Sequence, residues 1–185
     1  MRDDFGFRCV YCQSHEAEVG PGLPYGGFEV EHHQPTQKFR HLASRYDNLL
    51  WACPTCNRVK RDKWPSPEEH DRGYRFVDPS RERLSDHVEL RGTSLVALTP
   101  AGEYTIDELE LNLGVHPQRR ERRLKFLKLV SLLEVLVEHH ATRGLEVPAG
   151  VPEALAEARR DLGLVLPSDA PTSCLCRGRP PLYAA

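Results

Sequence analysis

Residues 53–60, CPTCNRVK, place two cysteines directly before an asparagine and basic residues. The same Cys-x-x-Cys spacing occurs at residues 9–12, CVYC. Two such hooks can close a tetrahedral shell of four thiolates around Zn²⁺, whereas a redox-active pair would need only one of them. We therefore predict that a structural zinc ion stabilises the fold, because a small domain gains much of its folding free energy from such a site. Its predicted ligands are Cys9, Cys12, Cys53 and Cys56.

The segment between the hooks, residues 13–52, is longer than the roughly 15 to 20 residues that a plain zinc ribbon needs. It contains EHHQP at residues 31–35 and leads into NLLWAC at residues 48–53. A carboxylate and an imidazole on a strand, with an amide on the helix after the second hook, could supply two oxygen ligands for a divalent cation and a general base. The length of this segment indicates a second role besides zinc binding.

Local patterns predict the order strand, loop, strand, helix around the hooks. Residues 28–33 (FEVEHH) and 48–53 (NLLWAC) read as short strands, and Pro54 suits the first turn of a helix that runs to about Asp62. The WPSP stretch at residues 64–67 is a structure breaker. We place a domain boundary there, with a first module at residues 1–65.

The rest of the chain reads as a mainly helical part at residues 66–166, so the predicted fold class is α+β. Thr105 and Glu108 have capping-box spacing for a short helix that ends at Gly114. A long helix is predicted over residues 118–142, and a third after Pro152 with Gly163 as its stop. The long helix carries an apolar stripe that needs a covering surface. The stripe consists of Leu124, Leu127, Val130, Leu133 and Val137.

The last residues, 167–185, contain several prolines and read as a flexible tail. Cys174 and Cys176 are assigned to this tail, because a second zinc site would need two further ligands.

Composition is that of an ordinary globular protein, with 39% hydrophobic and 28% charged residues. No apolar run approaches the roughly 18 residues of a membrane span, so we do not expect a membrane protein. The N-terminus lacks a secretory signal, so we expect the protein to be cytoplasmic.

The net charge of −2 is unevenly spread, because residues 38–63 and 118–128 each carry a local balance of +5. Both stretches suit a phosphate backbone. The second fits a solvated helix face equally well.

The order C-x-x-C, acid-His-x-x-Pro, Asn-Leu, C-x-x-C-N-x-x-K resembles the HNH endonucleases of the ββα-metal (His-Me finger) fold, in the zinc-bound, McrA-like style. The likeness covers Cys9 to about Lys63. It implies a catalytic Mg²⁺ or similar ion held by Glu31 and Asn57, with His32 as general base. It also implies that Asn48 braces the histidine loop.

Three positions depart from the commonest family pattern. Glu31 stands where Asp or His is commoner, and Asn57 where His often stands. The doublet His32-His33 leaves open which imidazole is the base; we favour His32, since successive side chains on a strand face opposite ways and His33 would then pack. His41, in the loop between the ligand segments, is a further candidate.

Basic residues on the helix of the second hook are expected to contact phosphates of the nucleic acid, and DNA is the favoured polymer. These residues are Arg58, Lys60, Arg61 and Lys63.

The segment that follows, from YRFVDPSRERL to QRRERR, is similar to one in compact bacterial HNH proteins, some of which work beside an ATPase in anti-phage defence. This similarity implies a protein partner on the helical part.

The sequence therefore predicts a metal-dependent endonuclease, with bacterial defence as its setting. The alternative is a non-catalytic zinc module that binds nucleic acid or a partner protein and has no use for Glu31, His32 or Asn57. A third reading is a latent nuclease, controlled by a partner that covers the apolar stripe between Leu124 and Val137.

Overall fold

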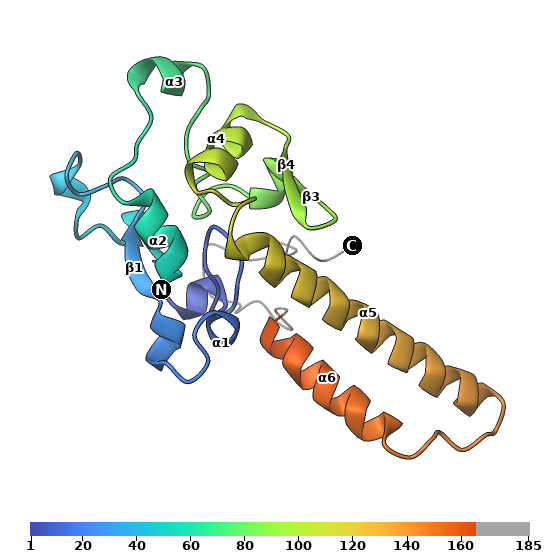
Figure 1. Cartoon of the computed structure of the whole chain (residues 1–185). Helices are drawn as coiled ribbons and strands as arrows, with labels where there is room; N and C mark the ends of the chain where they lie inside the picture. The colour runs from blue at the N-terminus through green and yellow to red at the C-terminus, as the bar shows by residue number, and fades with distance from the viewer. Residues whose placement is uncertain (166–185) are drawn as a thin grey trace.

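The structure, a computed structural model, describes the backbone of residues 1–165 and the side chains of residues 1–159. It combines helices with two small antiparallel sheets, so the predicted α+β class is confirmed (Figure 1). The predicted tail at residues 167–185, with Cys174 and Cys176, lies outside the described residues. Within residues 1–165, no helix combines the length and the apolar composition that crossing a membrane requires.

The first sheet and the helix after it form the predicted strand, loop, strand, helix unit. β1 (Glu29–His32) pairs antiparallel with β2 (Leu49–Ala52), in a register that sets Glu31 opposite Leu50. α2 (Pro54–Lys60) follows at once, because Pro54 is preorganised for a first helical turn and the Cys53 side chain caps it. The end of β1 and the start of α2 are thereby held beside each other.

Short elements connect the larger ones. The short α-helices are α1 (Glu16–Val19) and α3 (Pro67–Asp71). The 3-10 helices are η1 (Asp3–Phe5), η2 (Pro24–Gly27), η3 (Arg40–Leu42), η4 (Tyr46–Asn48) and η5 (Leu84–Asp86).

A second hairpin and a helix follow α3. β3 (Val88–Arg91) pairs with β4 (Ser94–Ala97), a hairpin that the sequence analysis did not predict. The next helix, α4 (Pro100–Glu108), begins earlier than predicted, because Thr99 caps it by accepting a hydrogen bond from the Gly102 N–H at 3.1 Å.

The predicted cap at Thr105 and the predicted helix end at Gly114 are therefore wrong. Thr105 lies inside α4 and is fully buried, and its hydroxyl accepts a hydrogen bond from the Val77 N–H at 2.8 Å. The capping-box spacing is thus coincidental. Gly114 instead precedes the long helix, with φ +58°.

One hydrophobic core joins the hook region to residues 76–111. Phe76 is fully buried at its centre, with ring centroids 6.5 Å from Tyr11, 6.5 Å from Trp64 and 5.0 Å from Tyr104. Both hooks and β2 belong to the same cluster as Leu109 and Leu111. The core is thus continuous across the boundary that the sequence placed at residue 65.

The long helix α5 (Val115–Thr142) and α6 (Val151–Val165) form an antiparallel hairpin that projects from the rest of the molecule (Figure 1). α6 covers the Val130, Leu133 and Val137 part of the apolar stripe of α5, where these residues pack with Leu155 and Ala158. That part of the stripe therefore needs no partner protein to cover it. α6 also continues past Gly163, its predicted stop.

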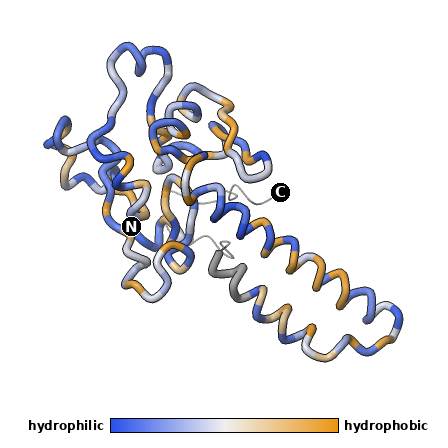
Figure 2. The backbone as a smooth tube through the Cα atoms, in the orientation of Figure 1, coloured by the Kyte–Doolittle hydropathy of each residue, from blue (hydrophilic) through white to orange (hydrophobic). Residues whose placement is uncertain are grey.

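Another apolar row of α5 stays exposed to solvent, in the part of the helix that carries much of the hydrophobic colour in Figure 2. Leu129, Leu132 and Val135 are 46%, 58% and 61% exposed.

A basic stripe docks the start of α5 onto the body of the protein. His116, Arg120 and Arg123 have the spacing of one helical face, and all three are buried. Arg120 donates hydrogen bonds to the carbonyls of Thr93 and Leu111, each at 2.6 Å. The two buried arginines are therefore not available to a phosphate backbone, so the phosphate reading of residues 118–128 is wrong for them.

Arg123 ties α5 to the loop after the first hook. Its guanidinium pairs with Glu18 at 3.2 Å and donates to the Ser14 hydroxyl at 3.1 Å. The Glu18 side chain is 3% exposed, so the pair is shielded from water.

We expect Arg123→Met to lower the free energy of unfolding by about 3 kcal/mol, because it leaves the Glu18 carboxylate buried without this cation. Chemical denaturation measures the change. Arg122→Met, one residue away on the exposed side of α5, is the matched control and should change stability by less than about 0.5 kcal/mol. Equal effects of the two substitutions would contradict the docking role of Arg123.

Candidate functional site

The two hooks meet as one cluster of sulfur atoms. The four Sγ atoms of Cys9, Cys12, Cys53 and Cys56 all lie within 4.8 Å of one another, and every one of these residues is buried. The Val10 N–H donates to the Trp51 carbonyl at 2.9 Å, which fixes the first hook against β2.

The geometry and chemistry of this cluster fit zinc. A tetrahedral Zn²⁺ with bonds of about 2.3 Å holds its sulfur ligands about 3.8 Å apart. The Sγ atoms of Cys12 and Cys53 are 3.8 Å apart. Four buried thiols form the soft donor set that zinc prefers. The cluster is therefore a candidate zinc site whose ligands are those that the sequence predicted.

α5 reaches this cluster through His116. The Nε2 atom of His116 lies 4.0 Å from the Cys56 Sγ, where its N–H can donate to the sulfur. Four thiolates around Zn²⁺ carry a net charge of −2, so a donor at this position stabilises them. His116 was not predicted to have a site role, because its spacing with Arg120 and Arg123 is that of a helical face but does not reveal what the face contacts.

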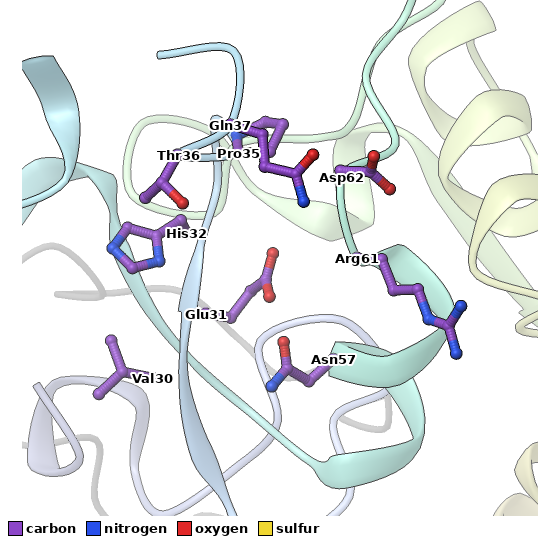
Figure 3. Close-up of a pocket in the computed structure, with 9 residues that line it drawn as sticks. All are labelled: Val30, Glu31, His32, Pro35, Thr36, Gln37, Asn57, Arg61 and Asp62. Atoms are coloured by element: carbon purple, nitrogen blue, oxygen red, sulfur yellow. The ribbon is translucent and has the colours of Figure 1, made fainter. Parts of the chain in front are cut away.

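A separate pocket lies beside the end of β1. Figure 3 shows side chains from β1, from the loop after it and from α2 around one space. Glu31, His32 and Asn57, which were predicted from distant sequence positions, all line it. The full lining is Val30, Glu31, His32, Pro35, Thr36, Gln37, Asn57, Arg61 and Asp62.

Asn57 is oriented by a neighbour of the pocket. Its Nδ2 donates to the Glu29 Oε2 at 2.6 Å, which directs the amide nitrogen toward Glu29. The amide oxygen is then on the side that faces Glu31 (Figure 3). The sequence analysis did not predict a role for Glu29, although it stands two residues before Glu31 on the same strand.

Glu31 is buried beside a buried lysine. The Lys60 Nζ lies 2.5 Å from the Glu31 Oε1 and donates to the His32 carbonyl at 2.8 Å. Burial raises the pKa of the Glu31 carboxyl above its usual value, although the Lys60 charge acts in the opposite direction. Burial likewise lowers the pKa of the Lys60 ammonium.

The predicted phosphate contact of Lys60 is therefore corrected. Lys60 has 0% exposure, and its ammonium is enclosed between β1 and the ring of Phe76, 5.3 Å away. A phosphate on the protein surface cannot reach it from outside. In the sequence Lys60 stands among other basic residues of the same helix region, so nothing local distinguished it as buried.

The two histidines of the doublet occupy different environments. His32 is partly exposed and lines the pocket, and its Nε2 lies 3.0 Å from the Ala43 carbonyl. A carbonyl only accepts hydrogen bonds, so Nε2 carries the proton and Nδ1 of the neutral ring is free to accept one. His33 is buried edge-on against Trp64, and burial lowers its pKa to about 4.

Asn48 holds the loop that follows β1. Its Oδ1 accepts from the Gln34 N–H at 2.8 Å, and its Nδ2 donates to the carbonyls of Gln34 at 3.1 Å and Leu42 at 3.3 Å. Asn48 is buried and does not line the pocket, so its contacts position the loop and do not reach a reacting group. His41 is exposed in η3 and also lies outside the pocket lining.

The other basic residues of the hook helix differ in how open they are. Arg58 and Arg61 are exposed, and Arg61 lines the pocket with a left-handed φ of +47° that is unusual for a residue with a side chain. Lys63 donates to the Glu108 carbonyl at 2.7 Å and pairs with its carboxylate at 3.2 Å. The two arginines are thus the better placed for an external ligand.

We expect purified protein to contain about one tightly held Zn²⁺ per chain, because four buried thiols converge at zinc-binding distances. Elemental analysis measures it. Cys53→Ser should lose the metal and much of the folded state, since the zinc contributes to folding. Folded wild-type protein without zinc would contradict the assignment.

Comparison with known proteins agrees with this geometry. Residues 9–63 match the family model described as HNH endonuclease, a span that includes both hooks and the whole lining of the pocket. No curated protein and no solved structure matches the chain. Residues 9–63 are therefore similar to an HNH endonuclease domain, and the four clustered cysteines fit the zinc-binding type of that domain.

Proposed function

We propose that the protein hydrolyses phosphodiester bonds in nucleic acid, with His32 as general base and Glu31 and Asn57 as ligands of a divalent cation. The observation that carries this proposal is the pocket at the end of β1, where a carboxylate, an imidazole and an amide from two segments line one space. A module that only binds would have no need to bring these three groups together. The match to the endonuclease family supports nuclease activity in general.

His32 is suited to take a proton from water. In the neutral ring, the Nε2 N–H donates to the Ala43 carbonyl, so Nδ1 is the atom that can accept a proton. The loop that supplies this carbonyl is braced by Asn48 through Gln34 and Leu42. Asn48 would therefore influence the reaction through the orientation of the histidine.

Glu31 and Asn57 offer the oxygen donors that Mg²⁺ and similar hard cations prefer. When bound, such a cation stabilises negative charge on the phosphate and on the leaving oxygen. Glu29 keeps the Asn57 amide turned so that its oxygen faces the pocket, and β1 holds Glu31 opposite it. The donor set present thus fits a small divalent cation.

DNA is the proposed polymer and bacterial defence the proposed setting, both on the strength of the sequence resemblance. Arg58 and Arg61 would hold phosphates beside the pocket, contacts that position a strand without reading its sequence. A protein partner such as an ATPase subunit would bind on the helical part. The reducing cytoplasm is the compartment in which four free thiols and a zinc ion coexist stably.

We expect His32→Ala to slow metal-dependent cleavage by about a hundred- to ten-thousandfold, the usual contribution of a general base. The variant should stay folded, keep its zinc and still bind nucleic acid, because His32 lies at an open pocket. Plasmid, single-stranded DNA and RNA, each with Mg²⁺, Mn²⁺ or EDTA, are the substrates to assay.

His41→Ala is the matched control, an exposed histidine in the same loop region that lies outside the pocket, and it should cleave at the wild-type rate. Normal cleavage by His32→Ala, together with loss of cleavage in His33→Ala, would show that His33 is the general base. Normal cleavage by all three would refute the nuclease mechanism at this pocket.

We expect charge reversal at Arg58 and Arg61 to weaken nucleic-acid binding for every sequence tested. Each lost phosphate contact should also flatten the slope of log K against log salt by about 0.9 for duplex DNA. Fluorescence anisotropy over a salt series measures both effects. Lys63→Gln is the control with a smaller expected effect, because its ammonium already pairs with Glu108. A loss confined to one sequence would contradict a phosphate role.

A further inference from the structure

A fully buried ammonium lies directly behind the proposed cation ligand. Lys60 has 0% exposure and Glu31 4%. Among the described side chains and backbone, the Lys60 Nζ pairs with the Glu31 Oε1 at 2.5 Å and donates to the His32 carbonyl at 2.8 Å. Both oxygens belong to β1, whereas Lys60 belongs to α2. The lysine therefore contacts two successive residues that the proposed reaction uses.

Stability alone does not account for this pair. Removing a carboxylate and an ammonium from water is costly, and apolar residues of the same size often serve a protein interior equally well. The surroundings are suited to such a replacement, because Phe76 lies against the ammonium and is itself fully buried. The charge of Lys60 thus calls for a role that an apolar side chain could not fill.

The position of Glu31 between Lys60 and the pocket suggests that role. Its carboxylate is bound on one side by the ammonium and lines the pocket on which His32 and Asn57 also converge. A buried carboxylate needs a positive charge close by. Lys60 supplies one from inside the protein, and a cation in the pocket would supply one from outside.

We propose that Lys60 is a positioning residue that acts as a resident cation for Glu31: it neutralises and orients the carboxylate before a divalent cation binds, and weakens the binding of that cation by repulsion. The inference rests on the proposed function insofar as Glu31 is a cation ligand. The hydrogen bond to the His32 carbonyl extends the same control to the backbone of the general base.

Lys60→Met tests the proposal, because methionine has a similar length and no charge. With its zinc bound and no other divalent cation added, the variant should melt at a lower temperature than wild type, since the Glu31 carboxylate loses its counter-charge. At pH 8, Mn²⁺ should raise its melting temperature more than it raises that of wild type. Calorimetry on zinc-loaded protein should show Mn²⁺ binding that is about tenfold tighter, because the repulsion is gone.

Lys63→Met is the matched control. Lys63 is the next lysine along the chain, and its ammonium pairs with Glu108 instead of Glu31. This variant should bind Mn²⁺ with wild-type affinity. Mn²⁺ affinity and Mn²⁺-dependent stabilisation that are unchanged in Lys60→Met would overturn the proposal, as would equal changes in both variants.

A double-mutant cycle with Glu31→Gln separates the pair from the cleavage reaction. In zinc-loaded protein without added Mn²⁺, the two single substitutions should each destabilise the fold, and the variant with both should be more stable than the sum of their effects predicts. Additive effects would overturn the pairing. Should Lys60→Met not fold with zinc alone, added Mn²⁺ should restore its folding. Failure of Mn²⁺ to do so, while the double variant folds with zinc alone, would also overturn the proposal.

The outcomes distinguish the two proposals. Wild-type protein that binds Mn²⁺ at this site but cleaves no nucleic acid would defeat the proposed function and leave the role of Lys60 intact. Wild-type protein that cleaves nucleic acid, together with a Lys60→Met variant whose Mn²⁺ response is unchanged, would support the proposed function and overturn the role of Lys60.

Discussion

The four cysteine sulfurs converge on one point, and this convergence sets the positions of the elements around it. It joins residue 9 to residue 56, and so holds β2 and the start of α2 against the N-terminal loop. The small sheet has only two strands, too few to be stable by itself. Because α2 starts inside the second hook, the same contacts that fix the sulfurs also fix Asn57 opposite β1. The candidate zinc site thereby determines the geometry of a pocket that contains none of its ligands.

The long helix α5 extends this dependence to the rest of the chain. His116 approaches the Cys56 sulfur, and Arg123 pairs with Glu18 beside the first hook. Positive and hydrogen-bond-donating groups are favoured next to a cluster of thiolates, so a helix start that is rich in arginine suits this surface. The α5–α6 hairpin is consequently anchored at the hooks and projects away from them (Figure 1).

The pocket itself combines an open wall and a closed one. His32 and Arg61 are accessible from solvent, whereas Glu31 is buried and pairs with Lys60 in the protein interior. Burial makes the carboxylate sensitive to every nearby charge, because a low local dielectric strengthens both attraction and repulsion. Such a ligand responds strongly to a cation and little to bulk solvent. The proposed reaction and the proposed role of Lys60 both follow from this placement of one glutamate.

Local spacing was enough to predict two Cys-x-x-Cys hooks, the strand, loop, strand, helix order, the long helix, and Glu31, His32 and Asn57 among the residues that line the pocket. It failed where several roles suit one residue type. Thr105 had the spacing of a cap but binds Val77 across the core, and Lys60 and Arg123 had the composition of a phosphate surface but lie inside. Only the tertiary structure decided these cases, because whether a charged side chain contacts solvent or a buried carboxylate depends on elements that are distant in sequence.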